Sequence, residues 1–592
     1  MSSVHLALSD DIVVVGYFAL VLFIGIYTRR AQKDAGDYFA GGHQVSWPLA
    51  GISHYMSGFS AFTFIVYSQI AYQYGLVAIL LFWMSVPACI VGGRFFASRW
   101  RRARIITPVE FLEQRCGFAV RQLFAWSSIP AKIFEDSLKL FTTALFLSVS
   151  AGLNMTTSIV VCGAIMVIYT MLGGLLALVV TNYILFLMKV LAILLLLPVA
   201  IIHLGGVHAS FHSIPPALLH WTNGPYGWTY VVGYGVLVMI SYNGSWAFAQ
   251  KFYSVPDEKS ARKVGYLSAV LNFVGTPILL LPAVIGHGLL PDMVAQHRGN
   301  DVYIELVFRL LPAGMFGVIV AALFSATMAT VSADLNVIAS VLTKDFWQRV
   351  LRPGASDREQ VYAGRLITGI LGVIIVLLSL WIAGSHSESL FQLMVTAFGV
   401  LLAPTMIPLL ALLCWRKLHS TGAYAGFAAG LISGVGTLLV RYALQRSAND
   451  PTGEMDYRIE GISIFVSVFV TFAAMWVTTM FCKPSENEVD RTKAFFLLLD
   501  TPIGDEAVSS SAYVGTHGSP NRLIAGSTIA VGGLLTIAGL LAPGLFGRRL
   551  DLIIGTGLTI YGLFRLWQSF REDRAVKLLA SKLLKEQNER CS

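Results

Sequence analysis

The stretch from Ala321 to Asp345 most narrowly limits what this chain can fold into. It is apolar and longer than the ~20 residues that a helix needs to cross a bilayer, yet Asp334 stands inside it. A carboxylate at the bilayer centre costs about 2.5–3.5 kcal/mol on insertion scales. We therefore expect Asp334 to face protein, water or an ion rather than lipid.

Small and polar side chains fill the middle of the same stretch. The i, i+3, i+4, i+7 spacing places four small residues on one helical face: Ala326, Ala329, Thr330 and Ala333. Hydroxyl and amide groups accompany them at Ser325, Thr327, Ser332 and Asn336. Close helix packing with interhelical hydrogen bonds would use this pattern, and so would a ligand site.

The chain as a whole is too apolar for a soluble protein. Of its 592 residues, 56% are hydrophobic and 13% are charged, and the mean hydropathy is +0.69. This composition predicts an all-α polytopic membrane protein in contact with lipid. Hydropathy predicts about fifteen spans, at roughly 11–28, 47–72, 76–97, 120–150, 156–177, 179–203, 229–250, 264–289, 312–342, 362–384, 389–414, 421–444, 459–481, 523–545 and 549–569.

Charge in the loops predicts the orientation. The loops after alternate spans hold most of the Lys and Arg, whereas the segment from Gly205 to Trp228 contains neither. The positive-inside rule then places the N-terminus outside and the C-terminus in the cytoplasm of a plasma membrane, in a bacterium the inner membrane. Because the basic residues lie in short loops, the formal charge of +9 does not indicate a nucleic-acid partner.

Two of the predicted spans are interrupted. In the first, Gly51 and Gly58 flank the polar run Ser53-His54-Tyr55, and the second break reads Ser241-Tyr242-Asn243-Gly244-Ser245-Trp246. The breaks open two five-helix units that enter the membrane from opposite sides, which is the inverted repeat of secondary transporters. Backbone groups freed at such breaks need partners, so we predict a binding site there.

This count gives the organisation of the chain. We predict an N-terminal helix and cytoplasmic loop (1–45), a first repeat (46–203), a second, inverted repeat (229–414), two additional transmembrane helices (415–482), a polar cytoplasmic loop (483–522), two C-terminal transmembrane helices (523–570) and a basic amphipathic tail (571–592). Such a tail can lie on the inner membrane surface.

Four charged residues lie within the predicted span 120–150. Lys132 and Asp136, like Glu135 and Lys139, are four residues apart, so each pair can neutralise its charges on one helix face. Structural pairing is one interpretation of this quartet. Contact with a solute, or a part in gating, is the other.

Four groups of residues follow the order and spacing of a known family. They are Asp37-Tyr38-Phe39-Ala40-Gly41-Gly42; Ile168-Tyr169-Thr170 with Gly173-Gly174 and Val180-Thr181-Asn182; Gln250-Lys251 with Asp257-Glu258-Lys259-Ser260-Ala261-Arg262; and Ala329-Thr330-Val331-Ser332 with Leu335-Asn336 and Thr343-Lys344-Asp345. Over about residues 10–480 the chain resembles the sodium:solute symporter family. The resemblance implies a LeuT-type 5+5 inverted repeat with additional N- and C-terminal transmembrane helices.

The resemblance also implies function and a cation site. It implies symport of a small organic solute with a sodium ion by alternating access. The sodium ligands would be the backbone carbonyls of Met56, Phe59 and Ala326 together with the side chains at positions 329 and 330. Ala329 stands where the family usually has serine, so one oxygen is missing unless water, Ser57 or Ser60 replaces it.

A second sodium is not expected. Asn182 stands at the family's aspartate, although Ser332 is retained opposite it. Asp334, Ser332 and Asn182 are candidates for coupling or gating, and a capping or loop-pairing role for Asp334 is the alternative.

The candidate solute-lining residues lie mainly at the two breaks. They are His54, Ser57, Ser60, Thr63, Phe82, Ser85, Asn243, Ser245 and Trp246. Phe82 stands where sugar-transporting members tend to carry glutamate, so the resemblance does not favour a sugar. His54 and Trp246 are also compatible with packing alone.

The predicted function is therefore secondary active transport rather than catalysis. A sodium-independent or proton-coupled transporter or sensor of the same fold is the alternative, with Asp334 or His54 carrying the proton. An intramembrane enzyme is a remote third, because the chain has no HExxH motif. The solute and the oligomeric state stay open.

Overall fold

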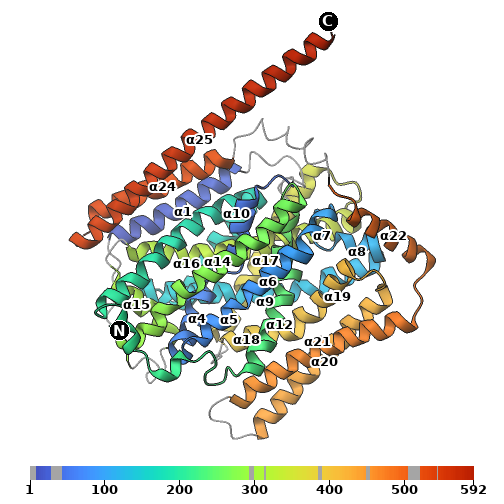
Figure 1. Ribbon diagram of the computed structural model, residues 1–592, viewed down its shortest axis with the longest axis horizontal. Helices are drawn as coiled ribbons and strands as arrows, with labels where there is room; N and C mark the ends of the chain where they lie inside the picture. The colour runs from blue at the N-terminus through green and yellow to red at the C-terminus, as the bar shows by residue number, and fades with distance from the viewer. Residues whose placement is uncertain are drawn as a thin grey trace.

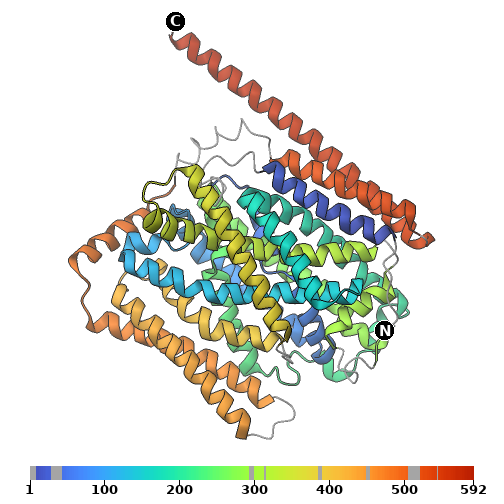
Figure 2. The same cartoon turned by 180° about the vertical axis from the view of Figure 1, so that it is seen from behind.

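The computed structural model describes residues 8–28, 43–291, 299–311, 315–384, 390–447, 454–503, 520–542 and 544–591, and these are predominantly helical (Figure 1). The motif at 37–42 lies outside the described residues. The bundle is flanked at one edge by the N-terminal helix and the last two helices, and at the opposite edge by α20 (Ser420–Ser447) and α21 (Glu454–Phe481) (Figures 1 and 2).

The first repeat opens with the predicted broken helix. Its two halves, α3 (Trp47–Ser57) and α4 (Ala61–Tyr74), are bent by 57°. The other members are α5 (Val77–Trp83), α6 (Ser85–Val91), η3 (Gly92–Phe96), α7 (Ala97–Arg102), α8 (Glu110–Cys116), α9 (Phe118–Ala151) and α10 (Met155–His203).

The second repeat also opens with a broken helix. Here α12 (Trp228–Gly244) and α13 (Trp246–Tyr253) are bent by 48°. It continues with α14 (Glu258–Ile285), α15 (Val302–Leu310), α16 (Met315–Leu342), η7 (Thr343–Leu351), α17 (Asp357–Gly384), α18 (Leu390–Ala397), η8 (Phe398–Leu402) and α19 (Ala403–Cys414). The short α11 (Val207–His212) lies in the connection between the repeats.

The bends lie where the sequence predicts them, and the two broken helices touch there. Ser60 and Ser245 have extended backbone and begin α4 and α13. At Gly58 an added Cβ would lie 2.5 Å from the hydroxyl of Tyr242. A side chain at position 58 would therefore separate the two breaks, which explains why glycine is needed there.

The small-residue helix α16 lies at the centre of the bundle. Every residue from Met315 to Val341 is buried, including Asp334. The prediction that Asp334 faces protein rather than lipid is confirmed.

The remaining helices surround this bundle. Near the N-terminus, α1 (Leu8–Thr28) packs against α10, α16 and α24 (Pro520–Leu541), and α24 pairs with α25 (Leu545–Cys591). At the other edge α20 (Ser420–Ser447) pairs with α21 (Glu454–Phe481).

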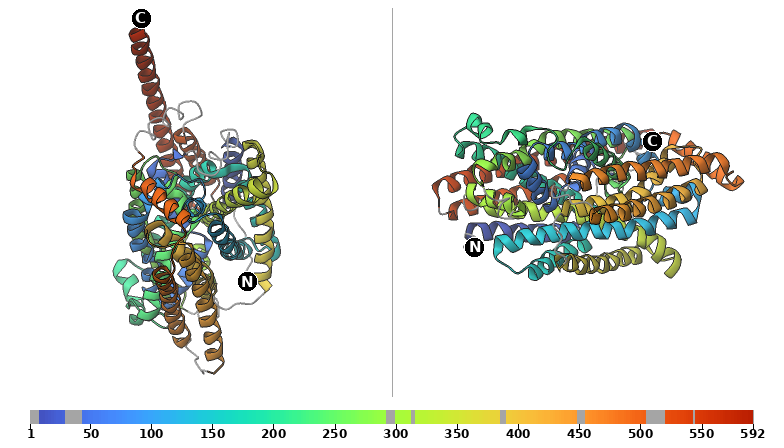
Figure 3. Two further views of the ribbon diagram at one scale, coloured as in Figure 1. Left: turned by 90° about the vertical axis from the view of Figure 1, so that its right-hand side faces the viewer. Right: turned by 90° about the horizontal axis from the view of Figure 1, so that it is seen from below.

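The two segments after α21 depart from their predicted form. The predicted polar loop 483–522 contains a helix, α22 (Glu486–Asp500), which begins at the Ser485 cap and packs on α8. The predicted tail 571–592 continues α25 as helix to Cys591, and this end of α25 extends beyond the bundle in the view from the side (Figure 3).

The number of spans is smaller than predicted. In the described part of the chain, 11 helices are long and apolar enough to cross a membrane, or up to 13 if each bent pair is one span. The predicted total of about fifteen spans is not confirmed. Segment 120–150 is helical as α9 but carries the charged quartet, and segment 179–203 belongs to α10, whose helical backbone is continuous from Met155.

Candidate functional site

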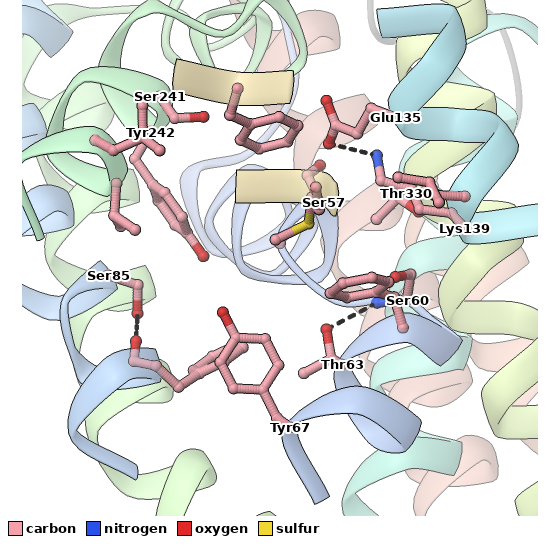
Figure 4. A pocket seen from close by; sticks show the side chains of 18 of the residues that line it. Ser57, Ser60, Thr63, Tyr67, Ser85, Glu135, Lys139, Ser241, Tyr242 and Thr330 are labelled. Carbon is pink, nitrogen blue, oxygen red and sulfur yellow. Dashed lines mark hydrogen bonds and ion pairs between the residues drawn. The ribbon is translucent and has the colours of Figure 1, made fainter. Parts of the chain in front are cut away.

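A cavity of about 110 Å³ lies between the two broken helices, α9 and α16. Hydroxyl groups reach it from Ser57, Ser60, Thr63, Ser85, Ser241 and Thr330, and aromatic rings from Tyr67, Phe82, Tyr234, Tyr242, Phe248 and Phe398. Figure 4 shows the labelled side chains, among them Ser57, Ser85, Tyr242 and Thr330, around the cavity; they come from helices far apart in the sequence. The surface combines hydrogen-bonding groups with apolar faces, as small-molecule sites do.

Five of the nine predicted solute-lining residues line this cavity. They are Ser57, Ser60, Thr63, Phe82 and Ser85. Ser57 and Ser85 already donate hydrogen bonds to the carbonyls of Ser53 and Phe82. Each hydroxyl oxygen can still accept a hydrogen bond from a solute.

The other four predicted residues are not among the described lining residues. His54 is hydrogen-bonded through Nδ1 to the hydroxyl of Ser268, 2.9 Å away. Asn243 donates from its amide to the carbonyls of Ala88 and Met239. Ser245 and Trp246 are buried beside the second break. The side chains of His54 and Asn243 are bonded to neighbouring helices, and Ser241 and Tyr242 contribute to the cavity from the segment of the second break.

A tyrosine pair that the sequence analysis does not assign forms part of the cavity wall. The hydroxyls of Tyr67 and Tyr234 are 2.5 Å apart. The pair joins α4 to α12 across 167 residues of sequence. Because each hydroxyl can both donate and accept, this pair links the two broken helices whichever group gives the proton.

The candidate sodium ligands lie where the first broken helix meets α16. Met56, Phe59, Ala326, Ala329 and Thr330 are all buried. The Met56 carbonyl accepts from the Phe59 amide at 3.1 Å, and the Thr330 hydroxyl donates to the Thr327 carbonyl at 2.9 Å. Three carbonyls and one hydroxyl are hard oxygens that suit sodium, whereas Ala329 contributes none.

Thr327 fixes this junction, although it is not among the predicted site residues. Its Oγ1 accepts from the backbone amide of Ala61 at 2.8 Å and from the hydroxyl of Thr143 at 2.6 Å. The start of α4 is thereby joined to α16 and α9 at one atom. The hydroxyl satisfies an amide that the helix itself leaves without a partner.

The charged quartet on α9 forms a network with Asp334. Lys139 lies within 3.1 Å of carboxylate oxygens of Glu135, Asp136 and Asp334. Lys132 lies 2.7 Å from Glu135 and 3.4 Å from Asp334.

The network corrects two of the pairing predictions. The predicted Glu135–Lys139 pair is present, but Lys132 pairs with Glu135 and Asp334 rather than with Asp136. Asp334 pairs with α9 and is neither a cap nor bound to a loop. Lys132, Glu135 and Lys139 also line the cavity, so structural pairing does not remove them from the cavity wall, and contact with a solute stays a prediction.

The remaining coupling candidates have protein partners. Asn182 donates to the Ser53 hydroxyl at 2.7 Å, and Ser332 is 2.6 Å from the hydroxyl of Thr170. These contacts hold α10 against α3 and α16.

Glu113 belongs to a second charge cluster, beyond the end of α16. It lies 2.8 Å from both Arg121 and Arg349, and Arg121 also pairs with Asp345. Burial raises the pKa of Glu113, but hydrogen bonds from Arg349 and Arg121 outweigh it and hold the pKa below its usual 4.5. The cluster joins α8, α9 and η7.

Comparison with known proteins gives one family match and several distant relatives. The model of the sodium:solute symporter family matches residues 38–430. A sodium/glucose cotransporter 4 of Danio rerio is 25% identical over 76% of this chain and 74% of its own. A sodium/mannose cotransporter of Bos taurus is 24% identical, over 84% and 91%. A human sodium/myo-inositol cotransporter 2 is 24% identical, over 87% and 82%.

A solved structure has the same fold. It is the substrate-bound, outward-open state of a Na+-coupled sialic acid symporter, which superposes with a TM-score of 0.68 at 20% identity and covers 81% of this chain and 99% of its own. The predicted LeuT-type architecture with two inverted repeats is confirmed at the level of the fold.

Proposed function

Because the chain belongs to the sodium:solute symporter family, we propose that the cavity between its broken helices is the solute site of a sodium-coupled symporter. Membership of this family also makes the chain an integral membrane transporter. The observation that carries the proposal is the convergence of both breaks, α9 and α16 on one polar and aromatic cavity. In inverted-repeat transporters substrate and ion sites lie at this interface.

Sodium would be held beside that cavity. The carbonyls of Met56, Phe59 and Ala326 and the hydroxyl of Thr330 are its ligands in this proposal. Thr330 belongs both to this set and to the cavity wall, so an ion there would change the surface that the solute meets. Sodium needs only to favour the outward-open state, and solute binding then permits closure.

The solute is a small polar organic molecule. The hydroxyls of Ser57, Ser60 and Thr63 offer hydrogen bonds, and the rings of Phe82 and Tyr242 offer apolar faces. The named relatives carry glucose, mannose and myo-inositol. A polyol is therefore one class to test, beside amino acids and carboxylates, for which Lys132, Glu135 and Lys139 provide paired charges.

The energy of the sodium gradient is sufficient for uptake. One sodium ion moving down ~100 mV releases about 2.3 kcal/mol, and a tenfold concentration gradient adds about 1.4 kcal/mol. The basic loops between alternate spans support an orientation with the N-terminus outside and the C-terminus inside. An inward gradient would drive sodium into the cell together with the solute.

The test measures sodium dependence with a matched pair of variants. Purified protein is screened by thermal shift against polyols, amino acids and carboxylates in sodium or choline chloride, and any stabilising solute is then used for uptake into proteoliposomes. Thr330→Ala should remove the sodium-induced shift and the uptake, whereas Thr330→Ser, which keeps the hydroxyl, should retain both. Uptake that is equal in sodium and choline would refute the proposal.

A further inference from the structure

A second pocket, rich in arginine, lies at one end of the bundle. Its volume is about 250 Å³, and it is bounded by η3, α7, α14, α22 and the segment that follows α19. Five arginines and one carboxylate, that of Asp500, line it: Arg94, Arg99, Arg102, Arg262 and Arg416. Figure 1 shows α7 and α22 at this end of the molecule. The pocket shares no described lining residue with the solute cavity, so it needs an explanation of its own.

The charges of this pocket are only partly neutralised by the protein. Arg102 pairs with Glu258 at 2.8 Å, and Arg416 pairs with Asp500 at 2.7 Å. The other three arginines have no carboxylate partner among the residues that the structure describes; they are Arg94, Arg99 and Arg262. Guanidinium groups bind phosphate through two parallel hydrogen bonds. The pocket is therefore suited to a phosphate group.

The pocket lies where three candidate membrane spans have one of their ends. Val77–Arg102 and Leu390–Cys414 end there, and Glu258–Gly288 begins there. Such ends lie at the level of the lipid head groups. The positive-inside rule predicts the cytoplasmic side for these basic ends. Basic pockets between membrane helices on that side bind the head groups of anionic lipids.

An apolar groove of about 630 Å³ opens beside the pocket. It runs along α12 and is bordered by α6, η3, α19 and α21. Its described lining contains no charged or hydroxyl-bearing side chain. Cys414 lines both the pocket and the groove, and of two adjacent residues Phe95 lines the pocket and Phe96 the groove. The groove therefore begins beside the arginines.

The length of the groove corresponds to one acyl chain. On α12 its lining extends from Trp228 to Ile240, and a helix rises about 18 Å over this distance. The hydrocarbon of one leaflet is about 15 Å thick, half of a ~30 Å bilayer core. A free phosphate compound would have no use for such a groove, whereas a phospholipid would occupy the groove and the pocket together.

We propose that the arginine pocket and the apolar groove together bind one anionic phospholipid. Its phosphate lies among the three arginines without a carboxylate partner, and one acyl chain lies along α12. The bound lipid joins η3, α7 and α14 to α19 by neutralising the charges that these elements bring together. This site does not depend on the proposed solute and sodium sites.

The experiment counts bound lipids directly. The full-length protein is purified in a nonionic detergent and freed of lipid. Native mass spectrometry then follows the binding of dioleoyl phosphatidylglycerol or dioleoyl phosphatidylcholine, which have the same acyl chains and differ in the charge of the head group. Inorganic phosphate and glycerol 3-phosphate, added at millimolar concentration and followed by thermal shift, test the head group without the chains.

Two variants, each with a matched control, separate the pocket from the groove. Arg94→Gln/Arg262→Gln removes two unpaired arginines, and Arg352→Gln/Arg358→Gln removes two exposed arginines that do not line the pocket. Val232→Trp fills the groove at a position that is 49% exposed. Val373→Trp adds the same ring on α17, at a position that is 57% exposed and outside the groove.

The proposal makes a separate expectation for each protein. The wild type and both controls should bind phosphatidylglycerol more tightly than phosphatidylcholine. Arg94→Gln/Arg262→Gln should bind phosphatidylglycerol roughly 30-fold more weakly, because each basic residue near the surface contributes about a fivefold gain. Val232→Trp should weaken the binding of both lipids. Neither phosphate nor glycerol 3-phosphate should stabilise the wild type.

Three results would overturn the proposal, and none of them affects sodium symport. The first is equal binding of the two lipids by the wild type, and the second is an unchanged preference in Arg94→Gln/Arg262→Gln. The third is stabilisation by glycerol 3-phosphate together with normal lipid binding by Val232→Trp, which would indicate a site for a free phosphate compound. If the double variant fails to fold, Arg94→Gln alone decides, with an expected loss of roughly fivefold.

Discussion

Lys139 and Lys189 are both buried beside the first broken helix, but their surroundings are opposite. Lys139, on the α9 side, is within 3.1 Å of three carboxylates. Lys189, on the α10 side, meets one phenol and two aromatic rings. A lysine held by three carboxylates keeps its proton and fixes two helices together. Lys189 is held instead by one hydroxyl and by aromatic faces.

The largest expected effect comes from replacing Lys139 and Lys189, each in its own variant, with methionine. Lys139→Met leaves three carboxylates, of which Asp136 and Asp334 are buried, without their shared cation and should lower the free energy of unfolding by ~3–5 kcal/mol. Lys189→Met removes a buried charge that pairs with no carboxylate in the described part of the chain, and it should leave the stability equal or higher. Thermal and denaturant unfolding in detergent, both in choline chloride, measure the difference. Equal losses of stability in the two variants would contradict the difference drawn between the two lysines.

The next effect concerns the hydroxyl that joins α4, α9 and α16. Thr327→Ala leaves the buried amide of Ala61 without an acceptor and should cost ~1–3 kcal/mol of stability. Thr327→Ser keeps the oxygen and should restore most of it. If the alanine and serine variants unfold at the same temperature, the Thr327 hydroxyl is not what joins α4 to α9 and α16.

A smaller effect is expected at Tyr55. Tyr55→Phe keeps both ring contacts but removes the oxygen that accepts from Lys189, which should cost about 1 kcal/mol. In the Lys189→Met background the same change should cost nothing, so a double-mutant cycle isolates the contact. A loss that is identical in the two backgrounds would show that the Tyr55 hydroxyl acts through another partner.

The smallest effect is expected in the second charge cluster, at its partly exposed member Glu113. Glu113→Gln should lower stability by less than ~1 kcal/mol at neutral pH, because Glu113 and Arg349 are partly exposed. The pKa of Glu113 is lowered in the folded protein, so its contribution is present above the unfolded pKa and is lost as the pH falls through the folded one. The difference between wild type and variant should therefore shrink as the pH falls below 4.5. A difference that does not shrink at any acidic pH at which the protein is still folded would contradict this.

The sequence predicts the breaks well because their cause is local. Gly58 and the polar residues around Ser60 and Ser245 interrupt apolar runs, and the helices bend there. The predicted burial of Asp334 also follows from local cost, because a carboxylate does not face lipid. Lys189 carries the same signal, a charge inside an apolar stretch, and could have been found by the same argument.

The contents of the cavity could not be predicted in the same way. Five of the predicted residues line it as the sequence suggests, but Asn243 is bonded to another helix, and Ser245 and Trp246 are buried outside the described lining. The rotation of each half-helix after a break depends on what packs against it. For α12 that packing brings Ser241 and Tyr242 to the cavity instead.

By itself, then, the amino-acid sequence determined that this chain crosses the membrane many times and that two of its helices break. It also determined that one helix with a face of small residues lies among them. These features follow from hydropathy, glycine and charge, which act within a few residues. Only the tertiary structure decided that Asp334 pairs with Lys132 and Lys139, that Tyr67 meets Tyr234, and that Lys189 lies against Phe59. Those contacts join residues more than a hundred positions apart, and the packing of whole helices sets their geometry.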